Sequence, residues 1–341
     1  MNSALQLSAF SADQPVCVIV SNRQYLPLTE NWLAGFMRFG TKNLYIAAVD
    51  RYTFATLSAR GFCTELWEVR GLRQIFAVKI RAVAKLLHAG FDVLLSDVDA
   101  IWLKDCATLL SHPDYRAYDA LFSQSMSYPA AALERWGLAL CSGFFLLRTN
   151  RRTLAFVDQW LQLLVDERRT EQDALNCLLL RQHLQWQFED VHLFSDLYRP
   201  PEVAPHLRGN AQRSFYTRRM RAAWERFRST PLREIQAART ARALLRLLRP
   251  PSGEGPAREG RFYSSKVISG SYSSEHGAMS IGILPFRSYR RGCTDPADDP
   301  AMTHIGAGTD IARKIAAIKL NRPLAWYLDD ALLDSHRRGL K

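Results

Sequence analysis

Apolar segments alternate with amphipathic segments along the first half of the chain. Short apolar runs predict strands at Val16–Ser21, Asn43–Val49, Thr64–Val69, Asp92–Ser96, Ala120–Ser123 and Cys141–Leu147. Apolar positions three to four residues apart predict helices at Leu28–Phe39, Thr53–Arg60, Gln74–Ala89, Thr153–Leu164 and Gln172–Leu180. This alternation predicts an α/β fold, with a mainly parallel sheet flanked by helices and ligands beyond the C-terminal ends of the strands.

The pattern changes near residue 206. Residues 206–261 hold fourteen Arg, no Lys and four acids, and they end in the linker-like PPSGEGPAREG. We therefore predict three parts. Residues 1–205 form the first part of the α/β domain, 206–261 a basic helical insertion or lid with its linker, and 262–341 the part that completes the domain, with a charged tail. Strands are expected again at Lys266–Ser269 and Ser280–Leu284, and a helix at Asp310–Leu320.

The charge and the cysteine content indicate the type of partner and the cellular compartment. The chain has 45 Lys and Arg against 33 Asp and Glu, a formal net charge of +12, which favours anionic partners without choosing among them. The six scattered cysteines include no C-x-x-C pair and indicate buried thiols in a reducing cytoplasm. Residues 1–15 lack the features of a signal peptide, and no apolar run reaches roughly 18 residues. Any membrane contact is therefore expected to be peripheral, at the inner membrane face.

Two acids at the end of the fourth predicted strand carry the strongest chemical signal. Asp97-Val98-Asp99 stands between apolar runs in GFDVLLSDVDAIWLKD, where a solvated turn is less expected. Carboxylates two residues apart at a strand end can bind one hard divalent cation. Such a cation neutralises a nucleotide diphosphate and stabilises its charge when it departs.

A second signal lies in the segment THIGAG at 303–308. The imidazole of His304 is a suitable ligand for Mn²⁺. Small residues such as Gly306 let the backbone approach phosphates. A helix that starts near Thr309 offers N–H groups to an anion, and Lys314 adds positive charge.

Four blocks of the chain resemble the nucleotide-diphospho-sugar transferases related to plant cell-wall xylosyltransferases and arabinosyltransferases. They cover roughly residues 16–180 and read VIVSNRQYLPLTENWL, GFDVLLSDVDAIWLKD, CSGFFLLRTNRRTLAFVDQW and RTEQDALNCLL. The family often has Pro after the acid matching Asp105, where this chain has Cys106. The resemblance implies a GT-A fold, a Mn²⁺ or Mg²⁺ ion, and retaining transfer of a hexose or pentose from a nucleotide sugar, first of all a UDP-sugar.

The resemblance also implies roles for individual residues. Residues 1–205 then bind the nucleotide sugar, and 262–341 complete the metal site. Asp97, Asp99 and His304 are the expected metal ligands, and Gly306 and Lys314 are expected to support the diphosphate. Lys79 is expected near the donor, with a solvated helix charge as the alternative. Ser21, Asn22 and Tyr25 follow the first strand and are expected at the nucleoside, although a plain polar turn is the alternative. Gln172, Asp173 and Asp97 are the expected catalytic residues, the first two as contacts to the donor sugar.

Two other functions stay open at this point. Aromatic residues interleave with the arginines of 206–261, as in proteins that bind single-stranded nucleic acid, so DNA or RNA could be a ligand or a glycosyl acceptor. A lipid-linked glycan or lipopolysaccharide is another candidate for the anionic acceptor. A haloacid-dehalogenase-like phosphatase with Asp97 as nucleophile is the second alternative, but its motif normally follows the first strand.

Overall fold

The computed structural model describes residues 10–125, 128–136, 138–182, 184–187, 267–274, 276–286, 288–291, 300–305, 310–320 and 326–328. The chain divides into two compact units, Met1–Phe194 with Gly260–Lys341 and Ser195–Glu259, and every described residue belongs to the first. The predicted basic insertion at 206–261 therefore lies outside the described residues. The roles assigned to the three parts of the chain stay predictions.

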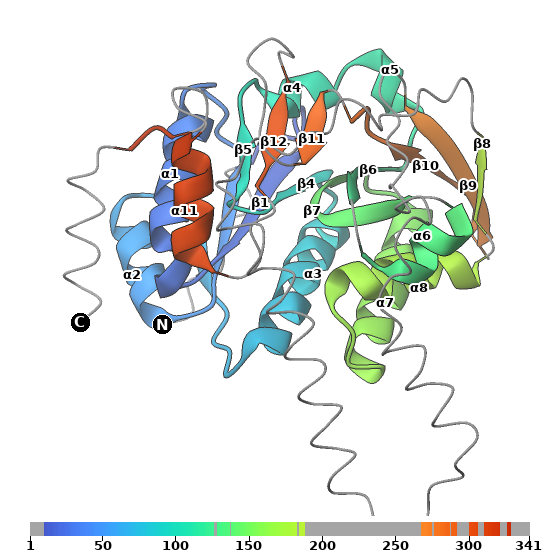
Figure 1. Cartoon of the computed structure of the whole chain (residues 1–341), viewed down its shortest axis with the longest axis horizontal. Helices are drawn as coiled ribbons and strands as arrows, with labels where there is room; N and C mark the ends of the chain where they lie inside the picture. Colours follow the sequence, from blue (N-terminus) through green and yellow to red (C-terminus); the bar gives the residue numbers. More distant parts are fainter. Residues whose placement is uncertain are drawn as a thin grey trace, which may run out of the picture. The chain divides into compact units, whose positions relative to one another are not determined.

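The described chain alternates strands and helices (Figure 1). The main sheet contains β1 (Val16–Ser21), β2 (Leu44–Ala48), β3 (Thr64–Leu66), β4 (Val93–Ser96), β6 (Ala120–Ser125), β7 (Ala139–Leu147), β8 (Gln185–Gln187), β9 (Ile268–Ser274) and β10 (Gly277–Ile283). A small sheet contains β5 (Ala100–Trp102), β11 (Tyr289–Arg291) and β12 (Met302–His304). The helices are α1 (Leu26–Met37), α2 (Arg51–Ala59), α3 (Leu72–His88), α4 (Cys106–Leu110), α5 (Pro113–Arg116), α6 (Ala130–Trp136), α7 (Arg151–Asp166), α8 (Glu171–Arg181) and α11 (Ile311–Leu320), with a 3-10 turn η2 (Arg23–Tyr25).

The main sheet is mostly parallel. Among the described residues its strand order is β3-β2-β1-β4-β7-β6-β10-β9-β8. The pairings make β7 and β9 run against all the other strands of this sheet. The predicted fold class, an α/β fold with a mainly parallel sheet flanked by helices, is confirmed.

Each face of the sheet has its own apolar core. Alternate residues of β1 point to opposite faces, with Val16 and Val18 in one cluster and Cys17 and Ile19 in the other. The first cluster is covered by α3, α7 and α8, and the second by α1, α4 and α11 (Figure 1). Helices on both faces leave the edge where β1 and β4 end as the place for a ligand.

After the gap in the described residues, the chain adds β9 and β10 to the main sheet. β10 lies parallel to β6, and Asp119, just before β6, holds it there. The N–H of Ser280 donates to Asp119 Oδ2 at 2.9 Å, and Arg152 Nη2 lies 2.7 Å from Asp119 Oδ1. The strand predicted at 280–284 is therefore present, with earlier bounds.

The expected buried thiols are found in part. Cys17, Cys106 and Cys141 are buried, whereas Cys63 and Cys177 are half-buried, and Cys293 lies outside the described residues. In the part of the chain that the structure describes, no helix is both long enough and apolar enough to cross a membrane.

Candidate active site

The two predicted metal-binding carboxylates stand on a tight turn between β4 and β5. Asp97 follows β4 directly, and its N–H donates to the carbonyl of Gly143 in β7 at 2.7 Å. The turn closes where the N–H of Ala100 donates to the carbonyl of Asp97 at 2.9 Å. The side chain of Asp97 is 35% exposed, and that of Asp99 is 5% exposed. Both acids lie at the edge where the alternation of strands and helices predicts a ligand.

His304 reaches this turn from the C-terminal part of the chain. β12 pairs antiparallel with β5, which sets His304 opposite Ala100, and the N–H of Ile305 donates to the carbonyl of Asp99 at 2.9 Å. The Nε2 atom of His304 lies 3.3 Å from Asp99 Oδ1 and 3.9 Å from Asp97 Oδ2. One ligand atom from each of the three residues lies within 4.8 Å of the others. Ligand distances of about 2.1 Å allow one cation to contact all three.

Gly143 leaves the space in which this cluster sits. A Cβ at Gly143 would lie 2.3 Å from Cε1 of His304 and 2.5 Å from Oδ2 of Asp97. Contacts this short are not tolerated, so a side chain at this position and the cluster cannot coexist in their present places. The three residues fit a Mn²⁺ or Mg²⁺ ion, since two carboxylates and one imidazole are suitable donors and the backbone beneath them makes room for the cluster.

Two lysines neutralise part of the charge at the cluster. The Nζ atom of Lys79, from α3, lies 2.6 Å from Asp97 Oδ1 and 3.2 Å from Glu171 Oε1 at the start of α8. The Nζ atom of Lys314, from α11, lies 2.5 Å from Asp99 Oδ2. Lys79 and Lys314, which are predicted to lie near the donor and its diphosphate, therefore each contact one of the two acids.

The ion pairs favour the charged forms of Asp99, Lys79 and Lys314. Burial raises the pKa of Asp99, but the neighbouring His304 and Lys314 outweigh it and hold this pKa well below its usual range. Burial lowers the pKa of Lys79, and its two carboxylate partners outweigh that effect, so the pKa is raised. The pKa of Lys314 is also raised, because the attraction of Asp99 exceeds the effect of burial.

The second ring nitrogen of His304 faces a thiol. Nδ1 of His304 lies 3.6 Å from Sγ of Cys141, which also accepts a hydrogen bond from the N–H of Gly143 at 3.4 Å. A polar partner on the second nitrogen orients a metal-binding imidazole. From the sequence alone, Cys141 is predicted only to be a buried thiol. No local signal links it to His304, because the contact joins β7 to β12.

The predicted sugar-binding residues lie in the first turn of α8. Gln172 Nε2 donates to Ser125 Oγ at 3.0 Å and to the carbonyl of Tyr128 at 2.5 Å. The carboxylate of Asp173 pairs with Arg169 at 2.7 Å. Glu171, directly before Gln172, contacts Lys79 and so ties this turn to the cluster. Their assignment as donor-sugar contacts stays a prediction.

The buried Asn176 fixes α8 against β7. Its Nδ2 donates to the carbonyl of Leu140 at 2.9 Å and to that of Gln172 at 2.8 Å, while its Oδ1 accepts the N–H of Leu140 at 2.9 Å. The asparagine of the block RTEQDALNCLL is therefore a positioning residue for the turn that carries Gln172 and Asp173.

The residues expected at the nucleoside follow β1. The hydroxyl of Ser21 is buried and lies 2.6 Å from that of Thr29, and Asn22 Oδ1 accepts the N–H of Tyr25 at 2.9 Å. The ring of Tyr25 lies 5.4 Å from Nζ of Lys314. Of this group, Tyr25 is therefore brought beside the cluster, whereas the side chains of Ser21 and Asn22 make local hydrogen bonds. The predicted diphosphate contact Gly306 lies outside the described residues.

Comparison with known proteins agrees with these motifs. Residues 40–204 match the model of the nucleotide-diphospho-sugar transferase family. Beta-arabinofuranosyltransferase RAY1 of Arabidopsis thaliana is 25% identical over 173 residues, which are 47% of this chain and 32% of that protein. Arabinosyltransferase RRA2 of Arabidopsis thaliana is 23% identical over 200 residues, 50% of this chain and 45% of that protein. The chain thus matches less than half the length of either relative.

Solved glycosyltransferase structures show a low similarity to this chain. The glycosyltransferase GlyE of Streptococcus pneumoniae TIGR4 gives a TM-score of 0.36 at 16% identity, over 48% of this chain and 43% of that one. The galactosyltransferase LgtC gives a TM-score of 0.35 at 13% identity, over 48% of this chain and 69% of that one. Neither the nucleic-acid-binding nor the phosphatase alternative is favoured by these comparisons. The predicted resemblance is therefore confirmed, and the chain is related to the nucleotide-diphospho-sugar transferases over the segment that carries Asp97 and Asp99.

Proposed function

We propose that this protein transfers a sugar from a nucleotide-diphospho-sugar to a hydroxyl group of its acceptor, with a divalent cation bound by Asp97, Asp99 and His304. The observation that carries the proposal is the convergence of these three side chains within 4.8 Å at the C-terminal edge of the sheet. Mn²⁺ suits this mixed donor set, and Mg²⁺ is the alternative. When bound, the cation neutralises phosphate oxygens and stabilises the charge of the departing nucleotide diphosphate.

The surrounding charges suit an anionic leaving group. Asp97, Asp99 and Glu171 carry three negative charges, and Lys79 and Lys314 carry two positive ones, so these five groups sum to −1 before the charge of a cation, bound by the neutral form of His304, is added. A divalent cation turns this to +1. The site then attracts a diphosphate, and the positive charge of Lys314 beside Asp99 strengthens this attraction.

The start of α8 is the part of the site that we assign to the donor sugar. Its support is the chain of contacts from Asp97 through Lys79 to Glu171, which brings the helix turn of Gln172 and Asp173 to the cluster. We expect Gln172 and Asp173 to orient the sugar while the acceptor hydroxyl attacks its anomeric carbon. The resemblance to retaining enzymes is the ground for expecting retention of configuration.

The names of the two Arabidopsis relatives, an arabinofuranosyltransferase and an arabinosyltransferase, support a pentose donor. Among candidate donors, UDP-arabinose is therefore the first to test, followed by other UDP-pentoses and UDP-hexoses. A cytoplasmic location and a hydroxyl acceptor of anionic character stay predictions.

Donor turnover is the direct test. The protein is incubated with Mn²⁺ and a panel of UDP-, GDP-, CMP- and dTDP-sugars, and released nucleotide is measured with and without EDTA. We expect release from one donor, lost in EDTA and reduced on the order of 100-fold or more in Asp99→Asn. The matched control is Asp114→Asn, whose side chain is 79% exposed and pairs with His112, and which is expected to keep full activity.

The result that overturns the proposal is absence of turnover across the panel together with no metal-dependent donor binding by calorimetry. If turnover occurs, NMR of the first-formed product reads its anomeric configuration. An inverted product rejects retention while leaving the transferase assignment in place.

A further inference from the structure

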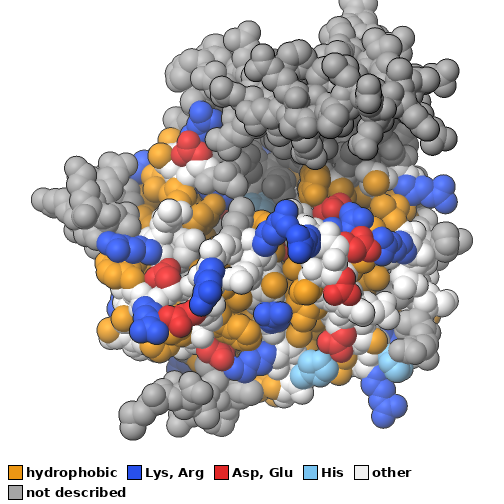
Figure 2. Space-filling view, turned by 90° about the horizontal axis from the view of Figure 1, so that it is seen from below, with side chains coloured by type: hydrophobic (Ala, Val, Ile, Leu, Met, Phe, Trp, Pro, Cys, Tyr) orange, Lys and Arg blue, Asp and Glu red, His pale blue; other side chains and the backbone are white. Residues whose placement is uncertain are grey.

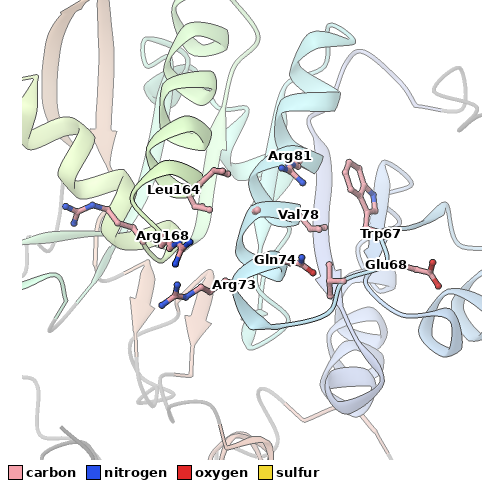
Figure 3. A pocket seen from close by; sticks show the side chains of 12 residues that line it. Trp67, Glu68, Arg73, Gln74, Val78, Arg81, Leu164 and Arg168 are labelled. Atoms are coloured by element: carbon pink, nitrogen blue, oxygen red, sulfur yellow. The ribbon is translucent and has the colours of Figure 1, made fainter. Parts of the chain in front are cut away.

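A basic cavity lies outside the metal cluster, between the start of α3 and the end of α7. It has a volume of about 470 Å³, and its lining includes Trp67, Arg73, Arg81, Leu164, Arg168 and Arg169 (Figure 3). None of the residues placed in the metal and donor site above lines it. We call it the arginine cavity.

The arginine cavity carries unbalanced positive charge. Arg169 is neutralised by Glu167 and Asp173, each at 2.7 Å. Glu68 is the only acid of the lining, and it pairs with Arg51 at 2.5 Å. Arg73, Arg81 and Arg168 form no ion pair within the described parts of the chain. All three side chains are exposed, so solvent and salt screen part of their mutual repulsion, and a bound anion would reduce the remainder.

The three arginines approach the cavity from two elements. Arg73 and Arg81 lie about two turns apart on α3, and Arg168 lies in the turn between α7 and α8 (Figure 3). Seen from below, a group of Lys and Arg side chains lies near the centre of the visible face, with Asp and Glu side chains beside it (Figure 2). Guanidinium groups from different directions suit a phosphate, whose oxygens accept hydrogen bonds on several sides.

The backbone of Arg168 adds an independent observation. Its φ is +52°, and no other described residue except glycine has a positive φ. Arg168 follows the C-cap residue Glu167 of α7, a position where glycine is the usual residue because it adopts this conformation without strain. An arginine kept there at a cost in backbone energy indicates a use for its side chain.

The floor of the cavity is apolar. Ala77, Val78 and Leu164 are buried, and Trp67 is half-buried at its side. A ligand that carries an aromatic or aliphatic group beside its phosphate would cover this surface. We propose that the arginine cavity binds a phosphate-bearing ligand whose apolar part rests on Trp67 and Leu164. The ligand is a free organic phosphate or the headgroup of an anionic phospholipid, and the proposal does not depend on the transferase activity.

Binding of phenyl phosphate, measured by calorimetry in EDTA, tests the site. We expect saturable binding that is tighter than binding of inorganic phosphate and is weakened roughly tenfold by either Arg73→Gln or Arg168→Gly. Arg168→Gly removes the guanidinium and also the backbone strain, so its loss of binding is not a loss of folding. Arg151→Gln, at the other end of α7, is the matched control and is expected to bind like the wild type.

Vesicle sedimentation separates the two sources of phosphate. Phosphatidylcholine vesicles are compared with and without phosphatidic acid, using the same variants. Binding to the acidic vesicles that Arg73→Gln abolishes identifies a headgroup, whereas binding of phenyl phosphate alone identifies a free ligand. The proposal is overturned if neither probe binds, if Arg151→Gln loses as much affinity as Arg73→Gln, or if only Lys314→Gln loses it, since that places the anion at the metal cluster.

Discussion

Gly143 and His304 lie so close together that a methyl group on Gly143 would stand 2.3 Å from Cε1 of the imidazole. The two residues come from β7 and β12, which belong to different sheets. Asp97 meets the same position at 2.5 Å through its Oδ2 atom. The glycine of the block CSGFFLL therefore makes room for the proposed metal site, and the proposal predicts that metal binding requires a glycine there.

Gly143→Ala is expected to weaken Mn²⁺ binding at least tenfold, because His304 or Asp97 must move away from the added Cβ. Overpacking of this kind also costs about 1–3 kcal/mol of unfolding free energy. Calorimetry with Mn²⁺ and urea unfolding measure the two effects. Gly71→Ala is the control, since no atom lies within 4 Å of a Cβ at that position. Unchanged Mn²⁺ affinity in Gly143→Ala would contradict the proposed ligand set.

Lys79→Met is expected to raise the Mn²⁺ affinity several-fold, because it removes a positive charge that sits 2.6 Å from Asp97. The same variant is expected to lose about 1–3 kcal/mol of unfolding free energy, since Glu171, which is 12% exposed, loses its partner. Lys85→Met is the control, because the pair of Lys85 with Glu65 is partly exposed and far less costly to break. Weaker Mn²⁺ binding in Lys79→Met would show that the lysine supports the cation rather than competing with it.

The carboxylate of Asp119 is expected to stabilise the fold at neutral pH and to lose this effect in acid. Burial raises its pKa, but hydrogen bonds from Arg152 and Ser280 outweigh this effect and lower the pKa below its ordinary range. The carboxylate therefore stabilises the fold above the unfolded pKa of about 3.9, and this stabilisation disappears when the pH falls through the folded pKa. Asp119→Asn should cost about 1–2 kcal/mol near pH 7 and progressively less below about pH 4.

Urea unfolding across this pH range, with Asp114→Asn as an exposed control, measures the contribution of Asp119. A difference between wild type and Asp119→Asn that does not change with pH would show that charge is not the basis of the clamp between β6 and β10.

Arg168→Gly is expected to raise the unfolding free energy by about 1 kcal/mol, because glycine adopts the positive φ of this position without strain. Arg168→Ala removes the same guanidinium but keeps a Cβ, so it separates the effect of the backbone from that of charge. Thermal unfolding of both variants checks the expectation. Equal stability of the glycine and alanine variants would remove the backbone argument for the arginine cavity.

Much of the fold followed from local patterns. The apolar runs at Val16–Ser21 and Asp92–Ser96 match β1 and β4, and the stripe at Gln74–Ala89 matches α3 within two residues at its start. The apolar period predicts these elements correctly because burial of one face of a helix or strand requires apolar residues at regular spacing in its local sequence. The small sheet was not predicted: β5, β11 and β12 have three residues each, too few for a period to appear.

The sequence by itself determined that Asp97 and Asp99 end a buried strand, and that such a pair suits a divalent cation. Only the tertiary structure decided what surrounds them. Pairing of β12 with β5 brings in His304, and the packing of α3 against the start of α8 joins Lys79 to a carboxylate 92 positions away. These contacts depend on which strands pair and which helices meet. The spacing of residues along the chain does not predict these strand pairings and helix contacts. The free energy that selects them comes from burial summed over the whole domain.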